Sequence, residues 1–173
     1  MITWLPESML ATRGRLALSH TPGSRSQSRD EALDEFVAQG VQHVLCLQEA
    51  DELSYLRKVE TMDERRSAVE LRGMQFTHEP IRDMEAPSLA QAQRIVAVLY
   101  NELREGRDVL VHCWAGLGRA GTIAACTMIC DGLGAQVAVA LLRSVRPGAV
   151  QSLVQERLIK QFADAWGAAD GST

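Results

Sequence analysis

Residues 112–122 have the types and spacing that point most directly to chemistry. Cys113 lies at the predicted carboxyl end of a buried strand, and Arg119 follows after five residues that include Gly116 and Gly118. The glycines permit the backbone conformations of a tight loop, and proline is absent, so every residue of the loop can donate its N–H. Such a loop at the start of a helix binds a dianion. The residues predicted to bind phosphate are Trp114, Ala115, Gly116, Leu117, Gly118 and Arg119.

The same loop favours Cys113 as a nucleophile. Converging N–H dipoles, the start of a helix and Arg119 all stabilise the thiolate relative to the thiol. Arg119 also presents a planar pair of donors that can hold two phosphate oxygens. A thiolate beneath a bound phosphate predicts phosphoryl transfer through a cysteinyl-phosphate intermediate, without a metal ion or any cofactor. The alternative is a chance C-x5-R pattern, which the preceding strand and the two glycines disfavour.

Alternating strands and helices are predicted around this loop. Apolar runs predict strands at 41–47, 74–79 and 108–112, and a short strand also falls within Ser8–Arg29. Helical spacing of apolar residues predicts a first helix that begins at Asp30 and further helices at 88–106, 121–131, 136–145 and 151–166. The predicted buried faces include Leu33, Phe36 and Val37 in the first helix and Val154, Leu158, Phe162 and Trp166 in the last.

This alternation predicts an α/β fold with a central, mostly parallel sheet flanked by helices. The length of 173 residues suits a single domain spanning 1–173, with a frayed tail at 167–173. Residues 49–73 are charged and helical in character. They contain no recognisable catalytic pattern and are predicted to be scaffold.

Composition excludes several classes of function. The formal charge is 18 − 22 = −4, which argues against nucleic acid as a partner, because binding it needs many cations. Four scattered cysteines suit neither a zinc site nor a disulfide framework, so we expect no metal and a reducing, cytoplasmic location. No apolar run is long enough for a membrane span, and the first ten residues do not resemble a signal peptide.

One segment departs from the acidic average. Ser8–Arg29 contains Arg13, Arg15, Arg25 and Arg29 and no acidic residue. It is predicted to include a surface loop that is either simply solvated or faces the substrate.

The sequence His112-Cys113-x5-Arg119 resembles the signature of the cysteine-based protein tyrosine phosphatases, in their dual-specificity branch. The loop sequence Gly116–Arg119 and the distance back to Asp83 look most like the cyclin-dependent-kinase-associated (inhibitor 3-like) phosphatase group. The resemblance spans about residues 30–166. It implies an α/β fold, hydrolysis of phosphotyrosine and of phosphoserine or phosphothreonine, and a phosphorylated protein as the partner.

The resemblance also implies a general acid that protonates the leaving oxygen. Asp83, in the segment 80–87, stands where the family places it, and Glu85 is the fallback. The alternative is that Asp83 only caps a turn.

Three further residues are implied in supporting roles. Gln151 and Gln155 match the glutamines with which the broader family orients the hydrolytic water, although they could instead belong to a helix N-terminal cap. His112 is expected to form a hydrogen bond within the loop and to tune Cys113.

One position departs from the family pattern. Ser or Thr usually follows the arginine and stabilises the departing thiolate, whereas this chain has Ala120. Thr122 cannot be assumed to replace it, because two residues along a helix correspond to a rotation of about 200°. Slow breakdown of the phosphoenzyme is therefore expected.

Two alternatives to a protein phosphatase follow from the residues. A phosphoprotein-binding module with weak turnover would keep Arg119 and the loop, but this chain also has Cys113 and Asp83. A phosphatase for a non-protein phosphomonoester is the second alternative. The loop contains no lysine, which disfavours a polyphosphorylated lipid headgroup.

Overall fold

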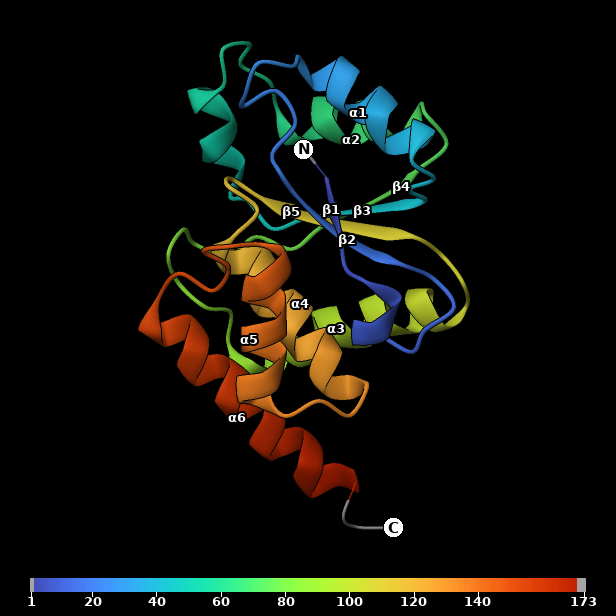
Figure 1. Cartoon of the computed structure of the whole chain (residues 1–173). Coiled ribbons are helices and arrows are strands. Elements are labelled where there is room, and N and C mark those ends of the chain that lie inside the picture. Colours follow the sequence, from blue (N-terminus) through green and yellow to red (C-terminus); the bar gives the residue numbers. More distant parts are fainter. Residues whose placement is uncertain (1, 171–173) are drawn as a thin grey trace.

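The computed structural model describes residues 2–170 and is built around one five-stranded sheet (Figure 1). The strand order is β1-β2-β5-β3-β4, and only β1 is antiparallel to its neighbour. The bounds of the strands are β1 Thr3–Trp4, β2 Leu16–His20, β3 His43–Cys46, β4 Gln75–His78 and β5 Val109–Cys113. The predicted α/β fold with a mostly parallel sheet is confirmed.

Helices cover both faces of the sheet (Figure 1). One face carries α1 Arg29–Ala38 and α2 Met62–Glu70, and the other carries α3 Leu89–Arg104, α4 Gly118–Cys130, α5 Ala135–Val145 and α6 Leu153–Asp170. Two short 3-10 helices, η1 Glu7–Met9 and η2 Ala50–Tyr55, complete the chain. None of the helices in the described part of the chain is both long and apolar enough to cross a bilayer.

Local sequence explains where the elements begin and how they pack. Ser28 and Thr61 open α1 and α2 with capping boxes, in which each side chain accepts a hydrogen bond from the backbone three residues on. All five residues of β5 are buried, because this central strand packs against helices on both faces.

The structure corrects three predicted details. α4 begins at Gly118 rather than at Gly121, and α6 continues beyond Trp166 to Asp170, so the predicted frayed tail is wrong for 167–170; residues 171–173 lie outside the described part. Val37 and Val154 are 44% and 39% exposed, because the apolar stripes of α1 and α6 are narrower than predicted. The segment 49–73 forms η2 and α2, which confirms its predicted helical character.

The parallel arrangement gathers the carboxyl ends of the central strands at one edge. Cys113, the last residue of β5, pairs with His20 of β2, and His112 pairs with Cys46 of β3. The loops that follow β2, β3, β4 and β5 therefore all leave the sheet at the edge that carries Cys113.

Candidate active site

The loop that follows β5 has its carbonyl groups bound from outside. The carbonyl of Trp114 accepts a hydrogen bond from the N–H of Thr21 at 3.0 Å. Arg146 donates to the carbonyl of Gly116 at 2.6 Å and to that of Ala115 at 3.2 Å. In a trans peptide the N–H points opposite to the carbonyl, so the next three N–H groups point away from these outside partners. This is the orientation that the predicted anion-binding cup requires.

The two glycines of the loop have different roles. Gly116 has φ +68°, and a Cβ there would lie 2.1 Å from the carbonyl oxygen of Ser19. Gly118 needs no unusual φ, contrary to the prediction. A Cβ there would instead lie 2.8 Å from Oε1 of Gln151 and 2.9 Å from Nε2 of Gln155. Gly116 therefore permits the turn, and Gly118 permits the approach of two amides.

Arg119 is held beside the cup, with only 1% of its surface exposed. Its two terminal nitrogens contact both carboxylate oxygens of Glu52, at 2.5 and 2.8 Å. They also reach the carbonyl of Ile81 at 2.9 Å and Oδ1 of Asp83 at 3.0 Å. Burial alone would lower the pKa of Arg119, but Glu52, Cys113 and Asp83 outweigh it and raise the pKa. The guanidinium is therefore charged, and its buried Nε lacks a partner within the described residues.

Glu52 is a residue of the candidate site that the sequence did not reveal. It lies in η2, within the segment predicted to be scaffold, and its own Oε1 also accepts the N–H of Glu49 at 2.8 Å. A glutamate at this position looks like an ordinary helix-capping residue. Its partner Arg119 is 67 residues away, so no local spacing could have shown the pair.

The segment that carries Asp83 is fastened at both ends. Arg119 binds Ile81 and Asp83, while the α6 side contributes hydrogen bonds from Ser152 to the carbonyl of Met84 at 2.9 Å and from Gln155 to that of Glu85 at 3.1 Å. Met84 adopts φ +61° between these attachments. Asp83 is brought to the cup through Arg119, whereas the exposed Glu85 is held there only by its backbone.

Gln151 and Gln155 both lie against the loop at Gly118, but they differ in their contacts. Gln155 is buried, and its Oε1 accepts the N–H groups of Gln151 and Ser152 at 2.8 and 3.3 Å. Its amide is thus used for the cap of α6 and for the Asp83 segment. Gln151 is exposed, and its side-chain amide has no hydrogen bond among residues 2–170.

His112 and Thr122 do not support the nucleophile through hydrogen bonds. Neither ring nitrogen of the fully buried His112 makes a hydrogen bond of normal geometry within residues 2–170, so the hydrogen bond predicted inside the loop is not formed. Burial, and then the charge of Arg65, lower the pKa of His112 well below 6.5, and its interaction with the backbone of Cys113 opposes this only in part. The hydroxyl of Thr122 donates to the carbonyl of Gly118 at 2.8 Å, so it does not replace the hydroxyl missing at Ala120.

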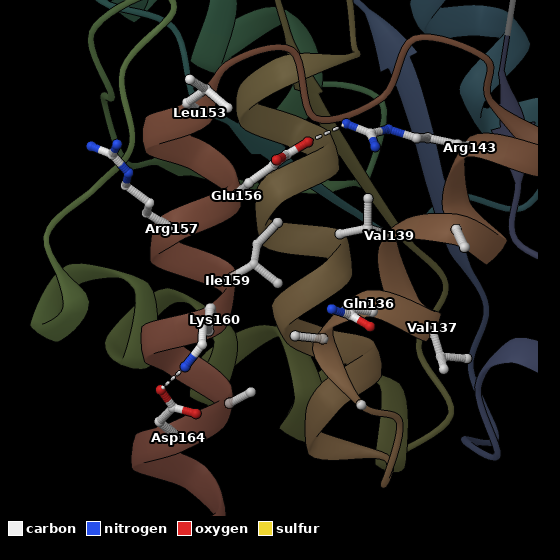
Figure 2. A pocket seen from close by; sticks show the side chains of 14 residues that line it. Gln136, Val137, Val139, Arg143, Leu153, Glu156, Arg157, Ile159, Lys160 and Asp164 are labelled. Carbon is white, nitrogen blue, oxygen red and sulfur yellow. Dashed lines mark hydrogen bonds and ion pairs between the residues drawn. The ribbon is translucent and has the colours of Figure 1, made fainter.

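A hollow of about 770 Å³ lies elsewhere, between α5 and α6 (Figure 2). Its charged side chains are partly paired, Arg143 with Glu156 and Lys160 with Asp164. None of the predicted site residues lines it. Among residues 2–170, no three His, Cys, Asp or Glu side chains are grouped as metal ligands would be.

Comparison with known proteins identifies the family. Residues 10–159 match the family described as "PTP-SAK: Swiss Army Knife protein, DSP-PTPase phosphatase domain". The chain belongs to this family of dual-specificity and tyrosine phosphatase domains.

Individual relatives agree with this assignment. Cyclin-dependent kinase inhibitor 3 of Rattus norvegicus is 30% identical over 170 residues, covering 94% of this chain and 78% of the relative. The crystal structure of kinase-associated phosphatase with its catalytic-site cysteine replaced by serine is 27% identical, with a TM-score of 0.85 over 97% of this chain and 96% of that one. The active form of Tk-PTP is 35% identical, with a TM-score of 0.72 over 87% and 92% of the two chains. The predicted resemblance to the kinase-associated group is confirmed.

The buried His112 predicts a pH dependence of stability. A histidine that stays neutral in the folded protein has an ordinary pKa in the unfolded chain. Below about pH 6.5 the unfolded chain therefore binds more protons than the folded protein. The free energy of unfolding should therefore fall as the pH drops from about 7 to 5, by at most about 1.4 kcal/mol per unit from this residue. Urea unfolding of His112→Asn should show a shallower slope, although not a flat one, because burial also lowers the pKa of His20 and His43.

An equal slope in His112→Asn and the unsubstituted protein would contradict the assignment.

Proposed function

We propose that this chain is a protein phosphatase that hydrolyses phosphotyrosine, and phosphoserine or phosphothreonine, through a cysteinyl-phosphate intermediate. The observation that carries the proposal is that Glu52 fixes Arg119 beside the loop that directly follows Cys113, whose carbonyl groups are bound from outside. Family membership and the names of the kinase-associated relatives support a phosphoprotein substrate.

The first step transfers the phosphoryl group to Cys113. The dianion binds the loop N–H groups and Arg119, including the free Nε. The sulfur attacks phosphorus in line, a P–S bond forms, the bond to the leaving oxygen breaks, and Asp83 gives that oxygen its proton. In the free protein Asp83 pairs with Arg119 at 3.0 Å. Bound phosphate takes over this cation and so releases the Asp83 carboxyl to act on the leaving oxygen.

The second step hydrolyses the cysteinyl phosphate and regenerates the free enzyme. A water molecule attacks phosphorus, Asp83 accepts its proton, the P–S bond breaks, and inorganic phosphate leaves with Cys113 as the thiolate. We assign orientation of this water to Gln151, whose amide is unused and lies against Gly118. Gln155 supports the site by holding the Asp83 segment and the start of α6.

We further propose that residues 1–173 form a single domain that works in a reducing cytoplasm, without a metal or cofactor. No disulfide joins the four cysteines, all of which lie in the described part of the chain, and burial raises the pKa of Cys46 to about 11.

Turnover of p-nitrophenyl phosphate tests the proposal. We expect hydrolysis that vanadate inhibits and that Cys113→Ser abolishes, because serine cannot supply the stabilised thiolate. A phosphotyrosine peptide should be hydrolysed with the same dependence. Phosphopeptide binding without any turnover would instead favour a binding module, and turnover in Cys113→Ser would overturn the assigned nucleophile.

Asp83→Asn separates the general acid from its fallback. Removing the proton donor should lower kcat for a phosphopeptide by about a hundredfold. Glu85→Gln is the matched control and should stay close to the unsubstituted rate, because the Glu85 side chain is exposed and its hydrogen bonds to the described residues come only from its backbone. The reverse pattern would make Glu85 the acid.

Ala120→Ser tests whether the missing hydroxyl slows the second step. A hydrogen bond to the departing thiolate is expected to contribute about 1–2 kcal/mol, so the steady-state rate should rise by about 5- to 30-fold. The burst of p-nitrophenol, which reports the first step, should keep its rate. An unchanged or lower steady-state rate would contradict slow phosphoenzyme breakdown.

A further inference from the structure

Three exposed cations on two loops remain outside the mechanism. Arg25 lies in the loop 21–28 that follows β2, and Arg57 and Lys58 lie in the loop 56–60 that follows η2. Together they line a hollow of about 310 Å³, whose walls also include Gly23 and Leu56. None of the three cations forms an ion pair with any residue that the structure describes. We call this hollow the basic hollow.

The basic hollow adjoins the phosphate-binding loop through Trp114. The N–H of Thr21, at the start of the first loop, donates to the carbonyl of Trp114 at 3.0 Å. The ring of Tyr55, which ends η2, packs edge-on against the ring of Trp114 with centroids 6.3 Å apart. Figure 1 shows the blue loop after β2 and the teal segment after β3 on the same side of the molecule. The two loops that form the walls of the basic hollow thus follow directly on residues that contact Trp114.

A buried ionic network fixes the two walls relative to each other. Glu60, 9% exposed, accepts hydrogen bonds from Arg29 and Arg65 at 2.8 Å each. The fully buried Arg65 also donates to Thr21 at 3.2 Å and to the carbonyl of Pro22 at 3.0 Å. The hollow is therefore a built feature rather than a chance approach of two mobile loops.

The acidic residues around the basic hollow are already occupied. Glu60 pairs with Arg29 and Arg65, Asp30 pairs with Arg29, and Glu31 closes the capping box with Ser28. Arg25, Arg57 and Lys58 thus have no ion-pair partner among the described residues, although the charge of Lys58 also acts on Asp30 and Glu64; the net charge of the chain is −4. Local positive charge beside a phosphate site favours a substrate with further negative groups.

We propose that the basic hollow binds acidic side chains that flank the phosphorylated residue of a protein substrate. This proposal rests on the proposed protein phosphatase activity and adds a substrate class to it. An extended peptide rises about 3.3 Å per residue, so side chains two to four positions from the phosphorylated residue lie about 7–13 Å away. The walls of the hollow start one or two residues from Tyr55 and Thr21, which contact Trp114, so such side chains can reach them. The proposal also assigns a substrate-facing role to part of the basic segment Ser8–Arg29.

The experiment compares a triple variant of the basic hollow, R25Q/R57Q/K58Q, with a control that makes the same change in charge, R13Q/R104Q/R157Q. The control residues are exposed and unpaired within residues 2–170. Arg13 and Arg104 lie at the amino ends of the strands, and Arg157 lies on α6. The substrates are p-nitrophenyl phosphate and phosphotyrosine peptides with neutral flanks, with Asp or Glu on either side, or with a second phosphate.

We expect the unsubstituted protein to prefer the acidic-flank peptides, with a preference that weakens as salt is added. In R25Q/R57Q/K58Q, kcat/KM for those peptides should fall about tenfold, as expected for three exposed ion pairs. In the same variant, kcat/KM for the neutral peptide and for p-nitrophenyl phosphate should stay within about twofold of the value for the unsubstituted protein. The control variant should stay within about twofold for every substrate. A fall larger for the doubly phosphorylated peptide than for the carboxylate peptides would identify phosphate as the preferred flanking anion.

Binding of the same peptides to the Cys113→Ser protein separates this proposal from the proposed function. A preference for acidic flanks that is lost in R25Q/R57Q/K58Q would support the basic hollow, even if the unsubstituted protein showed no turnover and the proposed activity failed. Turnover without any flank preference would overturn the basic hollow alone. Equal losses for all peptides would also overturn it, as would a dependence on the three cations seen only with phosphoinositide vesicles.

Discussion

The buried guanidinium of Arg119 is the interaction on which the arrangement of the site depends. A charge removed from water has to be compensated by partners of good geometry. Glu52 after β3, Ile81 and Asp83 after β4 and the start of α4 after β5 all meet at this one side chain. Because those strands are parallel, the three segments leave the sheet at the same edge. The fold thus brings the three segments together, and the charge of Arg119 fixes their positions relative to one another.

This arrangement couples the proposed phosphate site to the proposed general acid and to the start of α6. Asp83 is connected to the cup through Arg119, and its neighbours Met84 and Glu85 are connected to α6 through Ser152 and Gln155. A dianion that takes over Arg119 changes the partner of Asp83 while the rest of the segment stays attached to α6. The acid can then act in both proposed steps without a large movement of the loop.

The sequence predicted what depends on neighbouring residues and missed what depends on distant contacts. The loop 113–119 was predictable because strand, glycines, cysteine and arginine are consecutive, and the alternation of elements was sufficient to predict the sheet. Glu52 was missed because its role comes from an ion pair across 67 residues. The exposure of Val37 was missed because packing against the sheet, rather than helical periodicity, decides which side chains are buried. The start of α4 at Gly118 was missed because the conformation of the preceding loop, rather than periodicity, sets where this helix begins.

The central claim is that Cys113, beneath the cup and Arg119, carries the phosphoryl group during turnover. Rapid acid quench of the enzyme with a phosphotyrosine peptide, followed by peptide mapping by mass spectrometry, tests it most directly. The account predicts a phosphoryl group on the peptide that contains Cys113, at levels raised by slow breakdown at Ala120. It predicts none in Cys113→Ser. Turnover without this phosphoenzyme, or with the phosphoryl group on another residue, would contradict the account.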